Sequence, residues 1–346
     1  MARIRLQDVA ERAGVSIKTV SNVVNGKGTI TPATRERVQQ ALADLQYRPN
    51  VAARHLRRGA SGMIAVALPE LTQPYFAEVA SELVRAAKAR HLTVLLAQTD
   101  GLADSERAIS DGLDMPLMDG LVMSPLALTA EDLRHRLDST PIVLLGEHVG
   151  FDSPFPHVAI DNRRAARTAT AHLAQIGRRR IAAIGAKRTD GPNATPAETA
   201  ELRLDGYRAG LADAGLPWRD ELVAAVADFH RADGASAMHR LLDLAEPPDA
   251  VFCFNDLLAL GALRALRDRG LTAPDDVAVI GIDDIEEGRF STPSLSTVAP
   301  DKRAIAETAI DLLMSLRGTA DPSPVHAVAG HRLVARESTT GPGGPP

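Results

Sequence analysis

The chain has 346 residues, with 39 Lys and Arg, 44 Asp and Glu, and a single cysteine, Cys253. This length exceeds one typical domain, and one cysteine excludes an internal disulfide framework. No apolar run approaches the roughly 20 residues of a membrane span, and no signal peptide is readable at the start. We therefore expect a cytoplasmic protein without a membrane partner.

The charges are distributed unevenly along the chain. Residues 1–60 contain 11 Lys and Arg against 4 Asp and Glu, whereas the remainder contains 28 against 40. A basic module on an acidic body is typical of nucleic-acid binders, because Lys and Arg beside phosphates release counterions. A solvated helix surface is the alternative, but such a surface usually carries both signs. The excess of basic residues in the first 60 positions therefore favours DNA binding over a merely solvated helix surface.

The first predicted elements are two short helices within residues 6–25, separated by Gly14. Gly14 can adopt the positive φ of a tight turn, and Ser16 can cap the second helix. This pattern indicates a helix-turn-helix, whose second helix lies in the DNA major groove. A generic helical hairpin is the alternative. The polar residues of the second helix that then face outward are Lys18, Thr19, Ser21, Asn22 and Asn25.

A third helix is predicted to begin at Thr31 and Pro32, with Thr31 as N-cap and Pro32 in the first helical position. Its apolar residues would close a three-helix headpiece, which ends before Pro49. The segment VAARHLRR, residues 51–58, follows. It is too short to form a stable helix alone, and its composition reads as a basic linker.

From Met63 onward, short apolar runs alternate with helical stretches, which favours βαβ units and parallel sheets buried on both faces. Two successive series of runs predict two α/β lobes with a ligand crevice at their strand ends. The first series is MIAVAL, TVLLAQ, GLVMSP, PIVLLGE and HVAID, and the second is IAAIG, ELVAAVA, AVFCFN and VAVIGID.

No catalytic pattern is present in the sequence: GxSxG, HExxH, CxxC and GxxxxGK[ST] are all missing. We therefore expect no enzymatic activity, no cofactor and no metal. The acidic cluster at Asp283, Asp284, Glu286 and Glu287 is open to three readings: a metal site, a solvated turn, or a carboxylate that accepts hydrogen bonds from sugar hydroxyls. The third fits best for Asp283, which lies just beyond a predicted strand.

Other polar side chains have comparable positions. Asn255 also follows a strand, and Arg203 offers a planar fork of donors. Weaker candidates in the first lobe are Tyr75, Phe76, Asp100 and Ser124.

The motifs DVAERAGVS, TVSNVVN, TPATRERVQQALADLQYRPN and ARHL, at these offsets, resemble the lactose-repressor (LacI) family of bacterial transcription factors. The resemblance extends over nearly the whole chain. It implies an α/β fold class with an all-α helix-turn-helix headpiece (1–49), a hinge helix (50–60) and a two-lobed type I periplasmic-binding-protein-like domain (61–338). Lobe 1 would comprise about 61–159 and 300–322, and lobe 2 about 160–299 and 323–338, with crossings near 160, 299 and 323.

The resemblance also implies roles in DNA binding. The hinge helix would form only on operator DNA, where Leu56 wedges into the minor groove beside Arg54 and His55. Ile17, Lys18 and Asn22 fall at variable base-reading positions. The remaining headpiece matches are more constant positions near the DNA backbone, namely Ser16, Thr19, Ser21 and Asn25.

For the effector, the resemblance places Arg203, Asn255 and Asp283 on contacting positions, and Phe229 where the lactose repressor carries an indole. Gly146-Glu147 departs from the family, in which many relatives place an acid one residue earlier. The tail 339–346 is expected to be disordered and lacks a leucine-heptad extension. We therefore expect a homodimer.

The sequence thus predicts a nucleoid-associated transcriptional repressor that binds a palindromic operator and responds to a small effector, most simply a sugar. A nucleobase, a nucleoside or another metabolite is the alternative effector. A solute-binding protein would share the lobes but has no use for a basic headpiece, and an α/β enzyme lacks a nucleophile or cofactor loop.

Overall fold

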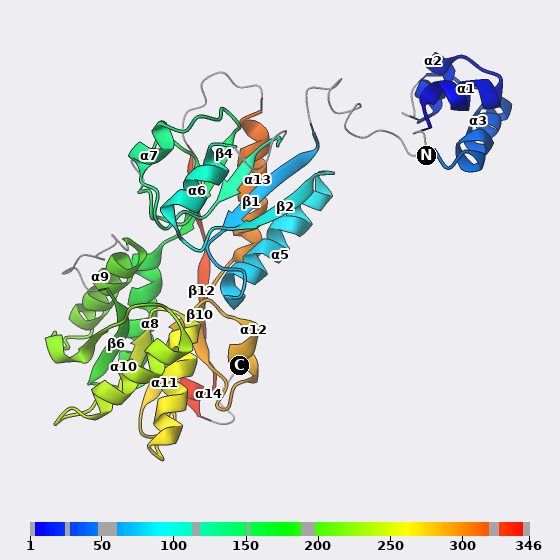
Figure 1. Ribbon diagram of the computed structural model, residues 1–346. Coiled ribbons are helices and arrows are strands. Elements are labelled where there is room, and N and C mark those ends of the chain that lie inside the picture. The colour runs from blue at the N-terminus through cyan, green and yellow to red at the C-terminus, as the bar shows by residue number, and fades with distance from the viewer. Residues whose placement is uncertain are drawn as a thin grey trace. The chain divides into compact units, whose positions relative to one another are not determined.

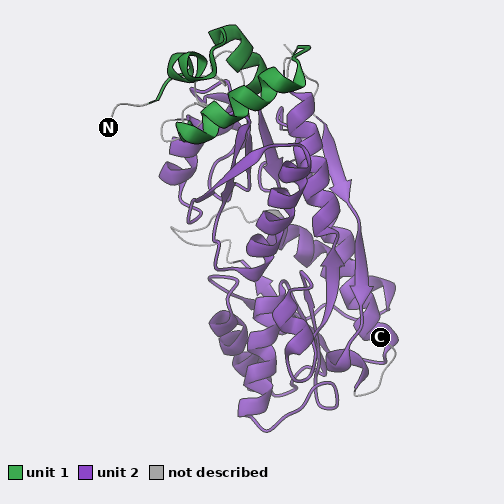
Figure 2. Ribbon diagram, turned by 90° about the vertical axis from the view of Figure 1, so that its right-hand side faces the viewer, with its two compact units in different colours: residues 1–61 green, residues 62–346 purple. Residues whose placement is uncertain are grey.

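The computed structural model describes residues 4–24, 28–47, 61–112, 118–150, 153–187, 198–317 and 325–341. The chain divides into two units, residues 1–61 and residues 62–346, which Figure 2 shows in different colours. The hinge segment 50–60 lies outside the described residues. No described helix is both long and apolar enough to span a bilayer.

The described part of the first unit contains the helices α1 (Leu6–Ala13), α2 (Ile17–Val24) and α3 (Pro32–Asp44). As predicted, Thr31 caps α3: its hydroxyl oxygen accepts from the Thr34 backbone N–H at 3.4 Å, and Pro32 takes the first helical position. Arg12 of α1 pairs with Asp44 of α3 at 2.9 Å. The buried core of this headpiece is formed by the predicted apolar positions, Val9, Ala10, Ala13, Val20, Val23, Val38 and Ala41.

The second unit contains two six-stranded sheets (Figure 1), which form two α/β lobes. The predicted fold class is confirmed. Lobe 1 has the parallel strand order β11 (His326–Ala329), β5 (His157–Ile160), β4 (Ile142–Leu145), β3 (Leu121–Met123), β1 (Met63–Leu68) and β2 (Thr93–Gln98). Its helices are α5 (Pro74–Ala89), α6 (Ala103–Ser110), α7 (Ala130–Arg134) and α13 (Lys302–Ser315).

Lobe 2 has the strand order β12 (His331–Val334), β10 (Ser296–Pro300), β9 (Ala278–Ile282), β8 (Ala250–Cys253), β6 (Ile181–Ala186) and β7 (Val223–Ala225). Only β12 runs antiparallel to its neighbour. The helices of this lobe are α8 (Asn162–Gln175), α9 (Glu198–Asp213), α10 (Arg231–Leu242), α11 (Asp256–Asp268), α12 (Glu286–Phe290) and α14 (Glu337–Thr340), with a 3-10 turn at Asp220–Leu222.

The central strands follow the expected pattern of burial, but β2 does not. All residues of β8 and β9 are buried, as apolar strands covered on both faces should be. In β2, by contrast, Leu95 and Leu96 are 36% and 47% exposed. The reason is position: β2 is an edge strand of lobe 1, and Leu95 and Leu96, which point to opposite faces of the sheet, are both partly uncovered.

The described residues of the second unit cross between the lobes at three places. The first two crossings lie between β5 and α8 and between β10 and α13. The third lies at Gly330, and the expectation of a crossing near residue 323 is wrong. Residues 326–329 form β11, which pairs in parallel with β5 of lobe 1, so they do not belong to lobe 2.

The expectation of a disordered tail from residue 339 is also wrong at its start. Thr339 lies in α14 and is buried, and its hydroxyl is 2.9 Å from His172 Nε2 and 2.7 Å from the Ser296 hydroxyl. These bonds anchor the chain to α8 and β10. Residues 342–346 lie outside the described residues.

Candidate functional site

The turn between α1 and α2 presents the first candidate surface. Gly14 ends α1 with φ +62°, the left-handed conformation that glycine adopts without strain. Ser16 then accepts the Thr19 backbone N–H at 3.1 Å and so caps α2. Both expectations for this turn are confirmed.

Helix α2 turns its apolar face inward and its candidate DNA-reading residues outward. Val20 and Val23 are buried in the headpiece core. Ser16, Ile17 and Lys18 are exposed, and Thr19, Ser21 and Asn22 are half-buried. The other predicted DNA contacts, Asn25, Arg54, His55 and Leu56, lie outside the described residues.

The second candidate site lies where strands of lobe 2 end. Asp283 directly follows β9, and Asn255 follows β8 and caps α11. Arg203, on α9, donates from Nη1 to the carbonyl oxygen of Phe254. All three side chains belong to residues that are buried.

Asn255 also holds the predicted aromatic residue in place. Its Nδ2 donates to the carbonyl oxygen of Phe229 at 3.1 Å, while its Oδ1 accepts the Leu258 backbone N–H at 2.9 Å. The Phe229 ring is half-buried, and the ammonium of Lys187 lies 4.8 Å from its centroid. A cation therefore already lies over the aromatic ring that stands where the lactose repressor carries an indole.

Lobe 1 contributes Tyr75 and Phe76 from the start of α5, with their rings edge to face at 5.4 Å. Burial raises the pKa of Tyr75, and the carboxylates of Asp283 and Glu147 add to the shift while Arg203 opposes it. Tyr75 of lobe 1 is therefore close enough to Arg203 and Asp283 of lobe 2 to interact with them electrostatically. Burial likewise raises the pKa of Asp283 to about 6, although Arg203 and Lys302 pull it down.

The remaining two candidates of lobe 1 are less well placed. Ser124 is buried directly after β3, and its backbone N–H donates to the Ala67 carbonyl at 3.0 Å. Asp100 is exposed, and its carboxylate accepts from Gln98 Nε2 at 2.6 Å. Among the described contacts, none joins Asp100 to the other candidates.

Sequence reasoning missed a buried chain of polar contacts beneath this site. Glu147, 3% exposed, follows β4 and accepts from Asn162 Nδ2 at 2.7 Å. Asn162 Oδ1 in turn accepts from Arg203 Nε at 2.7 Å. The chain thus runs from lobe 1, through the start of α8, to Arg203 in lobe 2. The only sequence signal was the acid at Glu147, which departs by one residue from the family pattern.

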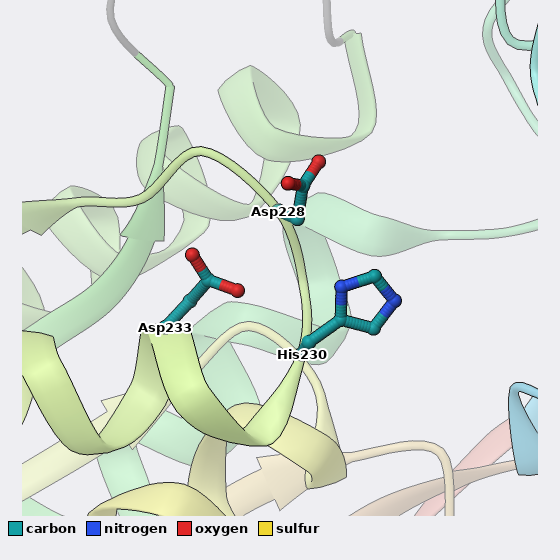
Figure 3. A group of neighbouring side chains, drawn as sticks. All are labelled: Asp228, His230 and Asp233. Carbon is teal, nitrogen blue, oxygen red and sulfur yellow. The ribbon is translucent and has the colours of Figure 1, made fainter.

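A second missed cluster surrounds Phe229. Figure 3 shows Asp228, His230 and Asp233, whose ligand-type atoms all lie within 4.8 Å of one another. No motif in the sequence indicated this cluster, because the histidines are scattered and there is a single cysteine. Lys187 supplies a positive charge beside this cluster: burial lowers the pKa of Lys187, and Asp228 and Asp233 oppose that shift.

The cluster also makes contact across the two lobes. His230 Nε2 lies 3.0 Å from Glu70 Oε2 of lobe 1, and Gln73 Nε2 lies 3.5 Å from the same ring nitrogen. A separate charged groove of about 680 Å³ is lined by residues that include Glu78, Arg85 and Lys302. None of the predicted effector residues lines that groove.

Headpiece and lobes together define a DNA-binding transcriptional regulator with a ligand-binding domain. Residues 5–50 match the family described as bacterial regulatory proteins, lacI family, and residues 170–339 match a periplasmic binding protein-like domain. The chain is 30% identical over 338 residues to catabolite control protein A of Priestia megaterium, covering 97% of this chain and 99% of that protein. The chain belongs to the lacI family.

Two solved structures are similar over nearly the whole chain. A complex of the transcriptional regulator CelR with cellobiose is 31% identical, with a TM-score of 0.68, covering 97% of this chain and 100% of that one. The lac repressor dimer bound to operator and the anti-inducer ONPF is 26% identical, with a TM-score of 0.85, covering 98% and 99%.

Proposed function

We propose that this regulator is a homodimeric repressor of a palindromic operator, and that a sugar bound between its lobes controls its affinity for DNA. The observation that carries the proposal is the hydrogen-bonded chain from Glu147 of lobe 1 through Asn162 to Arg203 of lobe 2. Tyr75 of lobe 1 interacts electrostatically with Arg203 and Asp283 of lobe 2. Carboxylates and a guanidinium in a buried setting suit a ligand with many hydroxyl groups. The cellobiose bound by CelR supports this class of effector.

Control of DNA binding would follow from a difference in affinity. A sugar that contacts both lobes favours one arrangement of the lobes over others, and it can shift the equilibrium only by its differential affinity. The proposed DNA contacts are the predicted residues of the headpiece and the hinge segment, namely Ser16, Ile17, Lys18, Thr19, Ser21, Asn22, Asn25, Arg54, His55 and Leu56. Changing the separation of two headpieces in a dimer would then weaken binding to two half-sites at once.

The homodimer is supported by the edge of lobe 1. Leu95 and Leu96 on β2, together with Val84 on α5, are exposed apolar side chains. An edge strand with exposed leucines is a liability unless another chain covers it. A second copy of this chain is the occupant that we propose.

Selection of bound sequences from a random DNA library, followed by mobility shifts at several salt concentrations, tests the DNA-binding half of the proposal. We expect a two-fold symmetric site and an affinity that falls steeply with salt. Failure to enrich any symmetric sequence would contradict it.

A thermal-shift panel of cellobiose, ribose, other sugars, nucleosides and nucleobases tests the effector. A ligand that binds only the native state raises the melting temperature by mass action. We expect a sugar to stabilise the full chain and to change its affinity for the selected operator. Stabilisation by nucleosides alone would replace the sugar with the alternative effector class.

A further inference from the structure

The turn that carries Asp283 has an unusual backbone. Asp283 has φ +129° and Asp284 has φ +50°, so two consecutive residues with side chains occupy the half of conformational space that favours glycine. Such conformations cost free energy and persist only where surrounding contacts hold them. The Asp283 backbone N–H donates to the Val298 carbonyl at 3.0 Å, and the Asp284 carboxylate pairs with Arg289 at 2.9 Å. The contacts that hold this turn therefore decide where the Asp283 carboxylate points.

Asp256, the first residue of α11, supplies further contacts from a buried carboxylate. Its Oδ2 accepts the Ile285 backbone N–H at 3.1 Å, and its Oδ1 accepts the Thr297 hydroxyl at 2.7 Å. The Thr297 oxygen accepts the Asp284 backbone N–H at 3.2 Å. One buried carboxylate thus fixes two successive amides of the turn, one directly and one through Thr297.

The backbone of Asp256 acts on Asp283 itself. An interaction with the backbone N–H of Asp256 lowers the pKa of the Asp283 carboxyl, against the effect of burial. This N–H belongs to the first turn of α11, where helix amides have no partner within the helix and favour a negative charge. The same residue therefore contacts the turn with its side chain and favours the ionised Asp283 carboxylate through its backbone N–H.

The strand beneath leaves space for this arrangement. A Cβ on Gly281 would lie 2.2 Å from Asp256 Oδ1, far closer than packing allows. The φ of Gly281 lies outside the left-handed range, so glycine is needed here for space and not for backbone conformation. Asp256 is 1% exposed and Thr297 is fully buried, so both contacts are shielded from bulk water.

We propose that Asp256 and Thr297 are positioning residues, which hold residues 283–285 in the conformation that presents Asp283 to the effector. The proposal rests on the effector role of Asp283 proposed above. It assigns no contact between Asp256 and the sugar.

Hydrogen exchange of the full chain without ligand tests the positioning role directly. In Asp256→Ala, and in Thr297→Val, we expect the amides of Asp284 and Ile285 to exchange about tenfold faster. Thr297→Ser keeps the hydroxyl and should restore the protection seen in the original chain. Unchanged exchange at both amides in Asp256→Ala and Thr297→Val would overturn the proposal.

Asp249→Ala is the matched control, because Asp249 accepts the backbone N–H groups of Arg179 and Arg180 at 2.9 Å each in the same lobe. It should disturb those amides and leave the 283–285 turn protected. If Asp256→Ala does not fold, the comparison of Thr297→Val with Thr297→Ser still tests the positioning role.

Titration with cellobiose, or with whichever sugar from the panel binds, distinguishes the positioning role of Asp256 and Thr297 from the effector role of Asp283. Asp256→Ala and Thr297→Val should raise the sugar dissociation constant at least tenfold, and Asp249→Ala and Thr297→Ser should not. If Asp283→Ala leaves sugar affinity intact while exchange changes as expected, the effector role of Asp283 fails and the positioning role stands. If Asp283→Ala abolishes binding and the exchange rates do not change, the positioning role fails.

Discussion

Asp283 is a buried carboxylate with positive φ and charged neighbours of both signs. Arg203 and Lys302 favour its ionised form, while burial and Glu78 disfavour it. A hydroxyl-rich ligand could replace the lost hydration of such a group. At the scale of single residues, Asp283 is therefore the side chain whose change should affect the effector response most.

Asp283→Ala should abolish the response of operator binding to the effector while leaving operator affinity in the absence of the effector unchanged. Asp283→Asn, which keeps the shape and removes the charge, should raise the half-maximal effector concentration by more than about tenfold, since hydrogen bonds to charged groups contribute roughly 1.5–3 kcal/mol. Mobility shifts across an effector titration measure both. Asp268→Ala, which removes a surface pair with Arg264 on α11, is the control. A normal response in Asp283→Ala would remove Asp283 from the site.

Asp256 gives the stability of the protein a dependence on pH. Burial and the neighbouring Asp283 raise the pKa of Asp256 to about 7, above its value in an unfolded chain. A raised acid pKa means that the folded state binds the proton more tightly, so this contribution is complete below about pH 4 and is lost as pH rises through 7. The free energy of unfolding should fall by at most about 1.4 kcal/mol per pH unit over this window.

Asp256→Asn imitates the protonated acid and should remove that dependence. Urea unfolding of both proteins at pH 5 and pH 8 measures it: the stability of the original chain should fall relative to that of the variant at pH 8. Parallel behaviour of the two proteins would mean that Asp256 does not titrate in this range.

At the scale of elements, the residue pattern predicted most of the structure that positions the site. The caps at Ser16 and Thr31 are local, and local hydrogen bonding can be read from neighbouring residue types. The apolar runs of both series formed strands β1–β9, because a run of apolar residues can also be read from neighbouring positions in the sequence. Strands β10, β11 and β12 were missed, because STVAP, HAVA and HRLV are short, mixed in polarity and defined by pairing with distant strands.

The candidate site was predictable only in part. Residues that follow strands, such as Asn255 and Asp283, could be located because parallel strands end at a common edge. Asn162 contacts Glu147, which lies 15 positions away in the sequence, and Arg203, which lies 41 positions away. Nothing in a local pattern specifies such a pairing, which is set by the crossing from β5 to α8.

The exposed edge strand allows a prediction for assembly. Leu96→Glu places a charge on the exposed edge strand β2 and should convert the proposed dimer into a monomer, because an unpaired charge in an apolar interface is strongly unfavourable. Sedimentation equilibrium measures the mass. Leu137→Glu, at an 80% exposed leucine between α7 and β4, is the control and should leave the mass unchanged. A dimer in Leu96→Glu would place the interface elsewhere.

At the scale of the whole molecule, DNA binding and ligand binding reside in separate units, so they can be altered separately. Leu56→Ala should weaken binding to the selected operator more than binding to random DNA, because a minor-groove wedge contributes only where the duplex is kinked. Mobility shifts with both DNAs measure the two affinities. An equal loss on both would show that Leu56 is not a wedge.

The order in which the chain passes through the lobes constrains how the protein can be made. Helix α13 packs on β3, β4, β5 and α5 of lobe 1, and β11 completes that sheet, yet both follow β10 of lobe 2 in the sequence. During synthesis, lobe 1 therefore lacks α13 and β11 until the strands β6–β10 of lobe 2 have been made. A nascent chain that ends at residue 300 has neither lobe's final edge strand, so the last tenth of translation completes both.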